Sequence, residues 1–391
     1  MTSTLYARHF ETMQSVCLQF DGEHIASAEP YECSPSEADG LPIVGPGLFD
    51  IQVNGYGGSW FSSQQLTVES VIEIIQSLVR QGIARCFPTL ITASFEALQH
   101  GFQTLQAACR ESELVNDCVA GFHLEGPYIS AVDGPRGAHP LQHVRPTNRD
   151  EFQRLQKAAG GRIRLVTLAA ESPGAVEFIQ LCRQSGVTVA LGHMAATTGQ
   201  IQEAVAAGAQ LSTHFGNGAH GVMPRHPNYL WDQLADDHLW ASVIADGWHV
   251  PASVLKCVLK CKTADRIILT CDVSGFGGCV PGTYQEGDVG VEVLEDGRIV
   301  VAGQRQFLAG SGATTGECVA EMMRACGVSL SMAIRMATSN PGRLLNEPIS
   351  DLRAGSLATL TVFRMGSDPE GGRSRFRPQK VYIRGREYGG S

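Results

Sequence analysis

The amino-acid sequence predicts an α/β fold: a (β/α)8 TIM-like barrel with a small β-sandwich domain formed from both chain ends. Three observations predict it. Eight short apolar segments with strand character lie between Leu48 and Asp272, and segments with helical spacing separate most of them. This alternation is typical of parallel strands joined by right-handed crossovers, and eight such strands can close into a barrel. Strand-like segments also occupy both ends of the chain.

The chain ends are expected to pair with each other. The N-terminal segment is strand-like as far as a polar stretch from Glu32 to Gly40, and the C-terminal tail is again rich in β-forming residues at 358–363 and 380–383. We therefore expect a small β-domain from residues 1–46 and 348–391 and a catalytic barrel from residues 47–347.

The barrel strands are short apolar runs that end in polar groups, and helices are expected between them. The strands are predicted at 46–55, 84–90, 119–124, 165–169, 187–191, 209–213, 240–245 and 266–271. After Thr67, apolar residues recur at helical spacing until Gly82 ends the pattern. Further helices are predicted at 94–110, 174–185, 198–207, 252–262, 317–326 and 331–338.

Composition excludes several classes of protein. Of 391 residues, 43% are apolar and 18% are charged, which is the balance of a globular protein. The net charge of −9 does not indicate a nucleic-acid or membrane partner. We find no apolar run long enough to span a bilayer, and the N-terminus lacks the apolar core of a signal peptide. The 12 cysteines are scattered without a C-x-x-C pair, so we expect free thiols in a cytoplasmic protein.

Polar residues that can bind metals follow the predicted strands. In barrels of this kind, catalytic groups lie at the carboxyl ends of the strands, so these residues share one destination. A single histidine there means little, but several at consecutive strand ends are hard to obtain by accident. The residues are Gln52 and Asn54 after the first strand, Glu125 after the third, His193 after the fifth, His214 after the sixth, His249 beyond the seventh and Asp272 after the eighth.

One carboxylate and two imidazoles suit a catalytic metal with an open position. Such a metal makes bound water more acidic and polarises a carbonyl. Asp272 is a candidate to take the proton of the water and return it to a leaving amine. His249 is a candidate to stabilise the developing oxyanion.

Five segments carry a resemblance to a known family. They are Gly121-Phe-His-Leu-Glu125-Gly-Pro-Tyr128, Leu191-Gly-His193, Thr213-His214, Ala245-Asp-Gly-Trp-His249 and Leu308-Ala-Gly-Ser311. Together they resemble the N-acetylglucosamine-6-phosphate deacetylases of the amidohydrolase superfamily, metal-dependent hydrolases that remove the acetyl group of an amino sugar. The resemblance runs from about Gly45 to Asn346, with a family-like β-tail beyond.

The resemblance implies a role for each matching residue. Glu125, His193 and His214 would bind one divalent metal, zinc first, with iron or manganese as alternatives, while Asp272 would be the catalytic acid and base. His249 would contact the acetyl carbonyl, and Arg225 would meet the sugar phosphate from the neighbouring subunit of a homodimer. Further substrate contacts would come from Ala138, His139, Asn217, Gly218, Leu308, Ala309, Gly310 and Ser311.

The first strand and the lysines favour a single metal. The superfamily often carries His-x-His where this chain has Gln52 and Asn54, and neutral amides are poor zinc ligands. Nor does any of the five lysines fall at a strand end, where binuclear relatives place a bridging carboxylated lysine. Gln52 and Asn54 would then orient neighbouring groups, as a vestige of a second metal site, or simply hydrogen-bond the backbone.

One segment departs from the family pattern. The family usually has T-H-x-x-N-A-M after the sixth strand, whereas this chain has Thr213-His-Phe-Gly-Asn217-Gly-Ala-His220, with His226 nearby. This loop lies where the substrate would be selected, so hydrolysis of another N-acyl compound, such as an N-acyl amino acid, a cyclic amide or an unphosphorylated amino sugar, stays an alternative. A non-catalytic relative is disfavoured because Glu125, His193, His214 and Asp272 are all present. A Rossmann-type enzyme is disfavoured because no G-x-G-x-x-G joins a strand to a helix.

Overall fold

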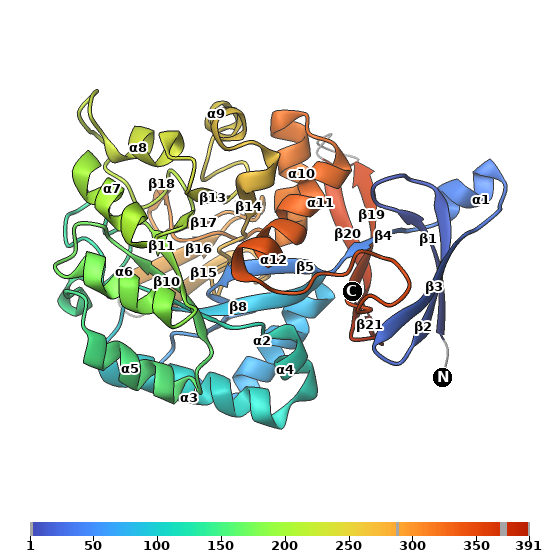
Figure 1. The fold of residues 1–391 in the computed structure, drawn as a ribbon, viewed down its shortest axis with the longest axis horizontal. Helices are drawn as coiled ribbons and strands as arrows, with labels where there is room; N and C mark the ends of the chain where they lie inside the picture. The colour runs from blue at the N-terminus through green and yellow to red at the C-terminus, as the bar shows by residue number, and fades with distance from the viewer. Residues whose placement is uncertain (1–2, 287–288, 368–373, 390–391) are drawn as a thin grey trace.

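The predicted barrel is confirmed by a computed structural model, which describes residues 3–286, 289–367 and 374–389. Eight parallel strands lie side by side in chain order, with helices around them (Figure 1). The strands are β5 (Leu48–Val53), β8 (Ile83–Ile91), β9 (Phe122–Glu125), β10 (Ile163–Leu168), β11 (Thr188–Leu191), β12 (Leu211–Ser212), β13 (Trp240–Val243) and β14 (Ile267–Leu269).

The ring of strands is nearly closed where β14 meets β5. A parallel bridge joins Val53 to Val273, and the backbone N–H of Asn54 donates to the carbonyl of Val273 at 2.9 Å. Below this point the buried carboxylate of Asp50 accepts from the hydroxyl of Thr270 at 2.6 Å and from the backbone N–H of Cys271 at 2.8 Å. Because Asp50 lies on β5 and its partners follow β14, these bonds hold the first and last strands together.

The helices cover the outside of the barrel, and most of them start at a polar cap, as in α2, where the Thr67 hydroxyl accepts from the N–H of Ser70. Those near predicted positions are α2 (Val68–Arg80), α3 (Phe95–Glu111), α6 (Ala175–Gln184), α7 (Thr198–Ala207), α9 (Ala252–Lys262), α10 (Thr315–Cys326) and α11 (Leu330–Met336). Those not predicted are α4 (Glu113–Cys118), α5 (Arg149–Ala158), α8 (Tyr229–Ala235), α12 (Ser339–Leu345) and the 3-10 turns Leu141–His143 and Ala264–Arg266. The third strand begins later than predicted because Val119 ends α4.

An apolar layer fills the amino-terminal half of the barrel. It is built from two side chains of β5 and one from each of five other strands, and two leucines of α12 pack against them. Its members are Phe49, Ile51, Phe87, Leu165, Ala190, Leu211, Ile268, Leu344 and Leu345. Since this layer packs the lower barrel, polar side chains are left to the carboxyl ends of the strands.

Both chain ends pair into one seven-stranded mixed sheet beside the barrel (Figure 1). In this sheet β4 lies parallel to β1 and antiparallel to β19, which joins the N-terminal strands to the C-terminal ones. A short helix, α1 (Pro35–Gly40), precedes β4. The strands, in spatial order, are β21 (Arg386–Gly389), β20 (Ser374–Ile383), β19 (Leu360–Ser367), β4 (Ile43–Pro46), β1 (Ser3–His9), β2 (Ser15–Asp21) and β3 (His24–Pro30).

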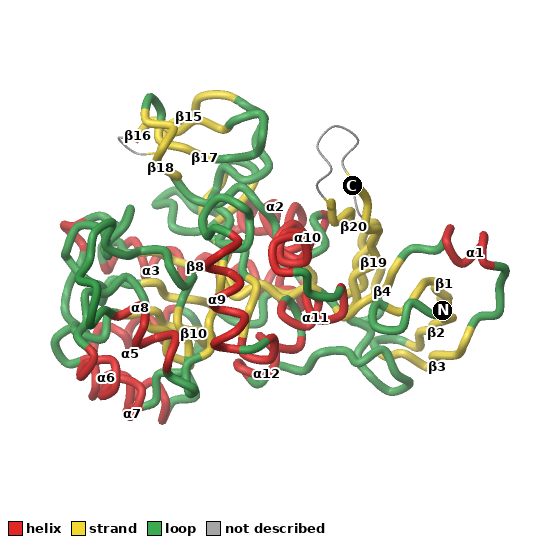
Figure 2. Tube along the Cα trace, turned by 90° about the horizontal axis from the view of Figure 1, so that it is seen from above, coloured by secondary structure: helices red, strands yellow, loops and turns green. Residues whose placement is uncertain are grey.

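A second, four-stranded antiparallel sheet was not predicted. It is inserted between β14 and α10 and stands apart from the barrel in Figure 2. Its strands surround a small apolar cluster that includes Phe276, Val291 and Ile299. They are β15 (Gly282–Glu286), β16 (Val289–Val293), β17 (Ile299–Val301) and β18 (Gln304–Leu308), and a two-stranded hairpin, β6 (Gly55–Tyr56) and β7 (Ser59–Trp60), follows β5.

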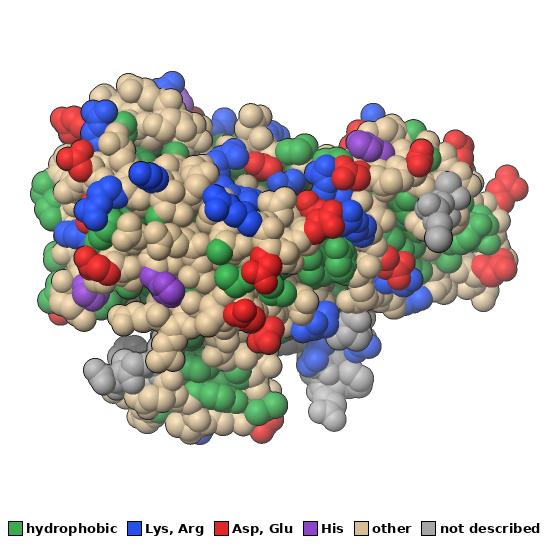
Figure 3. Space-filling view, turned by 90° about the horizontal axis from the view of Figure 1, so that it is seen from below, with side chains coloured by type: hydrophobic (Ala, Val, Ile, Leu, Met, Phe, Trp, Pro, Cys, Tyr) green, Lys and Arg blue, Asp and Glu red, His purple; other side chains and the backbone are tan. Residues whose placement is uncertain are grey.

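The surface carries mixed charge. On the face seen in Figure 3, acidic and basic side chains are interspersed rather than gathered by sign. Among the described residues, none of the helices combines the length and the apolar character that a bilayer crossing requires.

Candidate metal centre

Glu125, His193 and His214 converge at the carboxyl ends of β9, β11 and β12. Glu125 Oε1 lies 3.2 Å from His193 Nε2 and 2.9 Å from His214 Nε2, and the two imidazole nitrogens are 3.0 Å apart. All three side chains are buried, with relative exposures of 2%, 7% and 3%. Among the described residues this is the one group of three or more such side chains that is arranged to hold a metal ion.

The donor atoms fit a small divalent cation. The His193 Nδ1–H donates to the carbonyl of Pro135 at 2.9 Å, which turns Nε2 of the ring toward Glu125 Oε1. Imidazole nitrogens and a carboxylate oxygen that converge in this way are suitable ligands for one cation. Tetrahedral zinc with bonds of about 2.0–2.1 Å has ligand atoms roughly 3.3–3.4 Å apart, close to the observed edges of the triangle.

Hydrogen bonds within the cluster favour an ionised Glu125. Burial alone would raise the pKa of Glu125, but hydrogen bonds from His193 and His214 hold it well below its usual range. Burial would likewise lower the pKa of His214, but Glu125 raises it. The carboxylate is therefore ionised and available as a ligand.

The backbone at the strand ends directs the site residues inward and adopts strained conformations that cost free energy. His193, His214 and Asp272 each follow a barrel strand and have positive φ angles of 49°, 24° and 49°. Such angles cost non-glycine residues on the order of 1–3 kcal/mol and collect at functional sites. Gly218 packs so closely that a Cβ on it would lie 2.6 Å from His193 Nδ1.

A buried hydrogen-bond chain positions Glu125 from below. Gln52 donates from Nε2 to Glu125 Oε1 at 2.9 Å and accepts from the Thr213 hydroxyl at 3.2 Å. The Thr167 hydroxyl lies 3.4 Å from that of Thr213 and 2.8 Å from His123 Nε2. Burial lowers the pKa of His123 to about 4, so this histidine is neutral and adds no charge below the cluster.

Asp272 faces the cluster from the last strand. The Asn54 amide donates to Asp272 Oδ1 at 2.7 Å. Burial, followed by the negative charge of Glu125, raises the pKa of Asp272 to about 6, while His214, Asn54 and His249 act in the opposite direction. A carboxyl group poised near neutral pH suits acid and base catalysis.

His249 lies just beyond β13 and is held by Asp246. Its Nδ1 is 2.6 Å from Asp246 Oδ2, and its side chain is mostly buried. Its electrostatic effect on Asp272 places it on the same side of the barrel as the cluster.

The other predicted contact residues lie in loops around this centre. His139 is buried, accepts or donates at the Thr92 hydroxyl (2.8 Å) and stacks edge-on against His193 with ring centroids 4.3 Å apart. Asn217 donates to the carbonyl of His214 at 3.1 Å. Ala138 and Arg225 are exposed.

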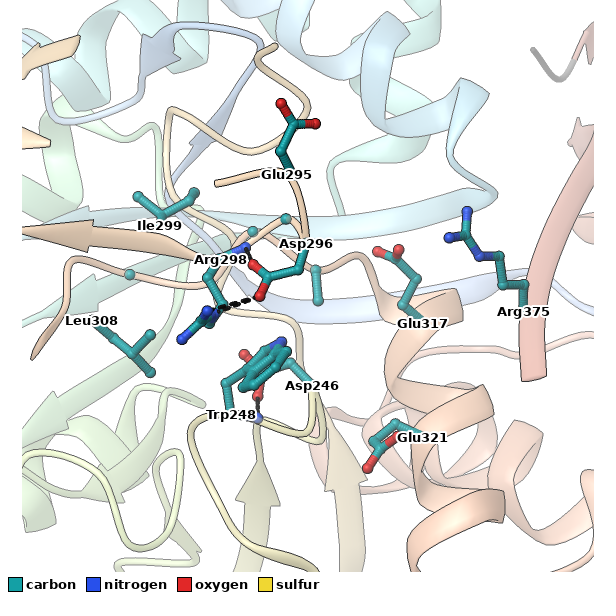
Figure 4. Close-up of a pocket in the computed structure, with 14 residues that line it drawn as sticks. Asp246, Trp248, Glu295, Asp296, Arg298, Ile299, Leu308, Glu317, Glu321 and Arg375 are labelled. Carbon is teal, nitrogen blue, oxygen red and sulfur yellow. Dashed lines mark hydrogen bonds and ion pairs between the residues drawn. The ribbon is translucent and has the colours of Figure 1, made fainter. Parts of the chain in front are cut away.

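The predicted segment Leu308 to Ser311 connects the inserted sheet to the barrel. Ser311 is buried and forms a bridge with Val273, while Gly310 packs on Ser274. Leu308 and Gly310 line a cavity of about 280 Å³ together with Asp246 and Trp248 (Figure 4). In that view Arg298 of the insert lies over Trp248, 4.6 Å from the ring centroid, and pairs with Asp296.

Sequence reasoning missed several polar residues of the site. Asp246, His123 and the hydroxyls of Thr167 and Thr213 hold the predicted residues in place, yet they were not singled out. Asp246 was visible as an acidic residue three positions before His249. Thr167 lies inside β10 and has no comparable signal in the sequence, whereas Thr213 follows β12 and belongs to one of the five family-like segments.

The loop of residues 213–220, whose sequence differs from the family pattern, packs against its neighbours. The backbone N–H of His220 donates to the hydroxyl of Tyr229 at 2.8 Å, and His220 Nδ1 lies 2.9 Å from the same oxygen. His226 is exposed. His220 is thus engaged with α8, and the loop reaches Gly134, where a Cβ would lie 3.1 Å from the His220 backbone.

Comparison with known proteins gives consistent similarities. Residues 43–388 match the amidohydrolase family. The chain is 30% identical over 345 residues to N-acetylgalactosamine-6-phosphate deacetylase of Escherichia coli O157:H7, covering 88% of this chain and 89% of that protein. It is 32% identical over 311 residues to N-acetylglucosamine-6-phosphate deacetylase of Bos taurus, covering 78% and 74%. A Mycobacterium smegmatis N-acetyl-D-glucosamine-6-phosphate deacetylase in complex with N-acetyl-D-glucosamine-6-phosphate superposes with a TM-score of 0.83 at 27% identity, covering 98% and 99%.

Proposed function

Because this chain belongs to the amidohydrolase family, we propose that it is a metal-dependent deacetylase of an N-acetylhexosamine 6-phosphate, with N-acetylglucosamine 6-phosphate as the preferred substrate. The products are acetate and the free amino-sugar phosphate. The observation that carries the proposal is the buried cluster of Glu125, His193 and His214 with Asp272 beside it. The names of the relatives support the substrate class.

Glu125, His193 and His214 would hold one divalent ion, zinc first and iron or manganese as alternatives. The bound ion would supply Lewis-acid chemistry, making water more acidic and a carbonyl more polar. Support for a single ion comes from Gln52, whose amide N–H points at Glu125 Oε1 where a second cation would need a ligand. Elemental analysis of the purified protein should find one ion per chain.

Asp272 would take a proton from the attacking water and give it to the nitrogen of the leaving amine. Its raised pKa and its bond from Asn54 support this role. His249 would donate a hydrogen bond to the acetyl oxygen as negative charge develops there. His139, Asn217, Gly218 and the segment 308–311 would surround the sugar, since they lie in loops at this end of the barrel.

Arg225 would bind the phosphate, reaching into the neighbouring subunit of a homodimer. Its exposed position supports a contact outside its own subunit. An Arg225→Ala variant should raise KM for the phosphorylated sugar by about 10–100-fold, the worth of a charge-assisted hydrogen-bond pair. Its activity on unphosphorylated N-acetylglucosamine should stay as in the wild type, and light scattering should show a dimer for both proteins.

A substrate panel tests the proposal. With the metal content matched, kcat/KM should be highest for N-acetylglucosamine 6-phosphate and lower by about 10–100-fold for the unphosphorylated sugar. N-acetylgalactosamine 6-phosphate is the second candidate, because a relative that covers most of the chain carries that name. Full activity on an N-acyl amino acid, with none on any acetylated hexosamine, would falsify the proposal.

A further inference from the structure

A second cavity lies where the barrel meets the terminal β-sheet, at the amino ends of the barrel strands and thus opposite to the metal centre. Its volume is about 310 Å³, at the small end of the range of about 300–1,000 Å³ for ligand pockets. Asp117 of α4 is the only acidic side chain among the described residues of the lining. Three arginines line the cavity, one near the start of β8, one directly before β10 and one in the turn between β20 and β21: Arg85, Arg162 and Arg384.

Two of the three arginines already have acidic partners. Arg85 Nη2 lies 2.5 Å from Glu347 Oε2, and this pair is mostly buried. Arg384 pairs with Glu23, and its Nε lies 3.9 Å from Asp117 Oδ1. Because 40% of the Arg384 side chain and 46% of the Glu23 side chain are exposed, this surface pair is worth little and can be exchanged for another anion. Arg85 is therefore committed to the barrel, whereas Arg384 is available to a ligand.

Arg162 differs from the other two, because among the described residues no carboxylate forms an ion pair with it. Its Nη1 donates to Asn116 Oδ1 at 2.9 Å, and its Nη2 donates to the carbonyl of Val119 at 2.7 Å. Both acceptors are neutral, and so is the ring of Phe122, whose centroid lies 5.7 Å from the guanidinium carbon. A guanidinium is always protonated in a protein, so Arg162 keeps its positive charge without a counter-ion.

Two neutral side chains of the lining can donate hydrogen bonds as well. Because Asn116 Oδ1 accepts from Arg162, the NH2 group of this amide is left to donate. The Thr359 hydroxyl accepts from the backbone N–H of Arg384 at 3.2 Å, so its own proton can go to another acceptor. The cavity thus gathers two guanidinium groups and two neutral donors, which suits a ligand that is rich in negatively charged acceptor oxygens.

We propose that this cavity is a binding site for a phosphate-type anion, held between Arg162 and Arg384 with Asn116 and Thr359 as neutral donors. Phosphate offers several charged acceptor oxygens, and arginine is the side chain that best matches their geometry. A bound anion connects the barrel, through Arg162, to the β20–β21 turn, through Arg384. The site goes beyond the proposed function and does not depend on the metal centre.

Asp117 opposes an anion in this cavity and therefore provides a test of sign. Its side chain is 15% exposed and lines the cavity beside Arg384. If the ligand is an anion, the charge of Asp117 weakens binding, so Asp117→Asn should strengthen binding by about 2–5-fold, the worth of one partly exposed charge interaction. A site that recognises a cationic group would lose affinity in the same variant.

The binding experiment uses the metal-loaded protein and inorganic phosphate, with sodium chloride at equal ionic strength as the reference. Hydrogen–deuterium exchange, followed by mass spectrometry, should show that phosphate protects α4 and segment 380–389. Arg162→Gln should raise the phosphate concentration needed for this protection by about 10–100-fold, because it removes charge-assisted hydrogen bonds. Arg384→Gln, which removes a more exposed charge, should raise it by about 2–5-fold.

Arg386→Gln is the matched control. Arg386 is a surface arginine of the same hairpin, pairs with Glu113 and does not line the cavity, so its variant should leave the phosphate dependence unchanged. Thermal unfolding checks that each variant is folded. Because Arg162 also bonds Asn116 and the Val119 carbonyl, Arg384→Gln and Asp117→Asn carry the test if Arg162→Gln does not fold.

Glucosamine 6-phosphate as a second probe distinguishes two sources of the anion. Protection at a lower concentration than with inorganic phosphate assigns the site to a sugar phosphate, and protection at an equal or higher concentration assigns it to free phosphate. The inference is overturned if phosphate does not protect α4, if Arg384→Gln binds as the wild type does, or if Asp117→Asn binds more weakly. These outcomes are independent of the substrate panel, which reports on the metal centre.

Discussion

The polar side chains at the two ends of the barrel have different surroundings. At the amino end, Arg85 and Arg164 share Glu347, with N–O distances of 2.5 and 3.1 Å, and Arg343 lies over the ring of Trp240. At the carboxyl end, one carboxylate and two imidazoles face each other without a basic side chain between them, and three residues there adopt strained backbone angles.

This difference indicates that polar side chains at the amino end contribute to stability, whereas those at the carboxyl end contribute to chemistry. At the amino end Arg85 and Arg164 both pair with Glu347, which holds strand starts to the end of α12, although Arg85 Nε is buried without a hydrogen-bond partner. At the carboxyl end, His214 Nδ1 and Asn54 Oδ1 are buried without a hydrogen-bond partner among the described residues. Such buried groups are costly, but others occur elsewhere in the described chain, so the carboxyl end is distinguished by its converging metal-ligating atoms.

The largest effect is expected from removing a ligand at the carboxyl end. Glu125→Ala should abolish metal binding and lower kcat/KM by about 10³-fold or more, since a metal contributes several kcal/mol to such reactions. Elemental analysis after dialysis, together with the deacetylase rate, checks this. A variant that keeps a full complement of metal would rule out direct ligation, and chelation of the wild type should reproduce the loss.

Asp272→Asn should keep the metal but lose about 10²–10⁴-fold in kcat, because an amide cannot accept and return a proton. Metal content and thermal unfolding should match the wild type. A near-normal rate at matched metal content would remove Asp272 from the mechanism and make the carboxyl end less distinct from the amino end.

Arg85→Ala tests the amino end. It leaves Glu347 with Arg164 alone and should lower the free energy of unfolding by about 1–3 kcal/mol, while the rate per folded molecule stays normal. Urea denaturation followed by tryptophan fluorescence measures the first quantity and the deacetylase assay the second. Arg353→Ala, an exposed arginine, serves as the control. A selective loss of rate in Arg85→Ala would mean that the two ends are coupled.

The smallest effect is a shift in pH dependence. Asp272 must be deprotonated to accept a proton, so kcat/KM should rise with pH through its pKa. Burial and, after it, the charge of Glu125 raise that pKa to about 6, and a bound cation would oppose the charge of Glu125, so the midpoint should lie at or below pH 6. Asn54→Ala removes a bond that lowers this pKa and should move the limb up by about half a unit to one unit. A limb that moves down or stays fixed contradicts the assignment.

Much of the barrel could be predicted from the hydrophobic periodicity and the composition of the sequence alone. Strands of buried Val, Ile and Leu alternate with amphipathic helices, and strand ends share one face, so residues remote in sequence, such as Glu125 and Asp272, were assigned to one site. The structure brings them together at the carboxyl end. This worked because the direction of parallel strands is a property of the whole fold and tolerates errors of a few residues in each boundary.

The inserted sheet and the supporting bonds did not follow from the sequence. The segment 282–308 contains short strands separated by turns that include Gly297 and Gly303, and its small core forms only when the strands pair. Thr167 and His123 are inside strands that read simply as buried, and Thr213 follows directly after β12. Which of them bond to one another depends on registers between strands, and single-sequence patterns do not encode those registers.

The insertion that carries β15 to β18 leaves the barrel just after Asp272 and returns at Ser311, where the bridge to Val273 pins its two ends together. A loop closed at its base passes little strain to the scaffold when its length or sequence changes. Segment 308–311, at its exit, can therefore be exchanged together with the sheet as a cassette. New sugar specificities should be reachable by grafting this cassette from relatives, with the hydrolytic machinery left in place.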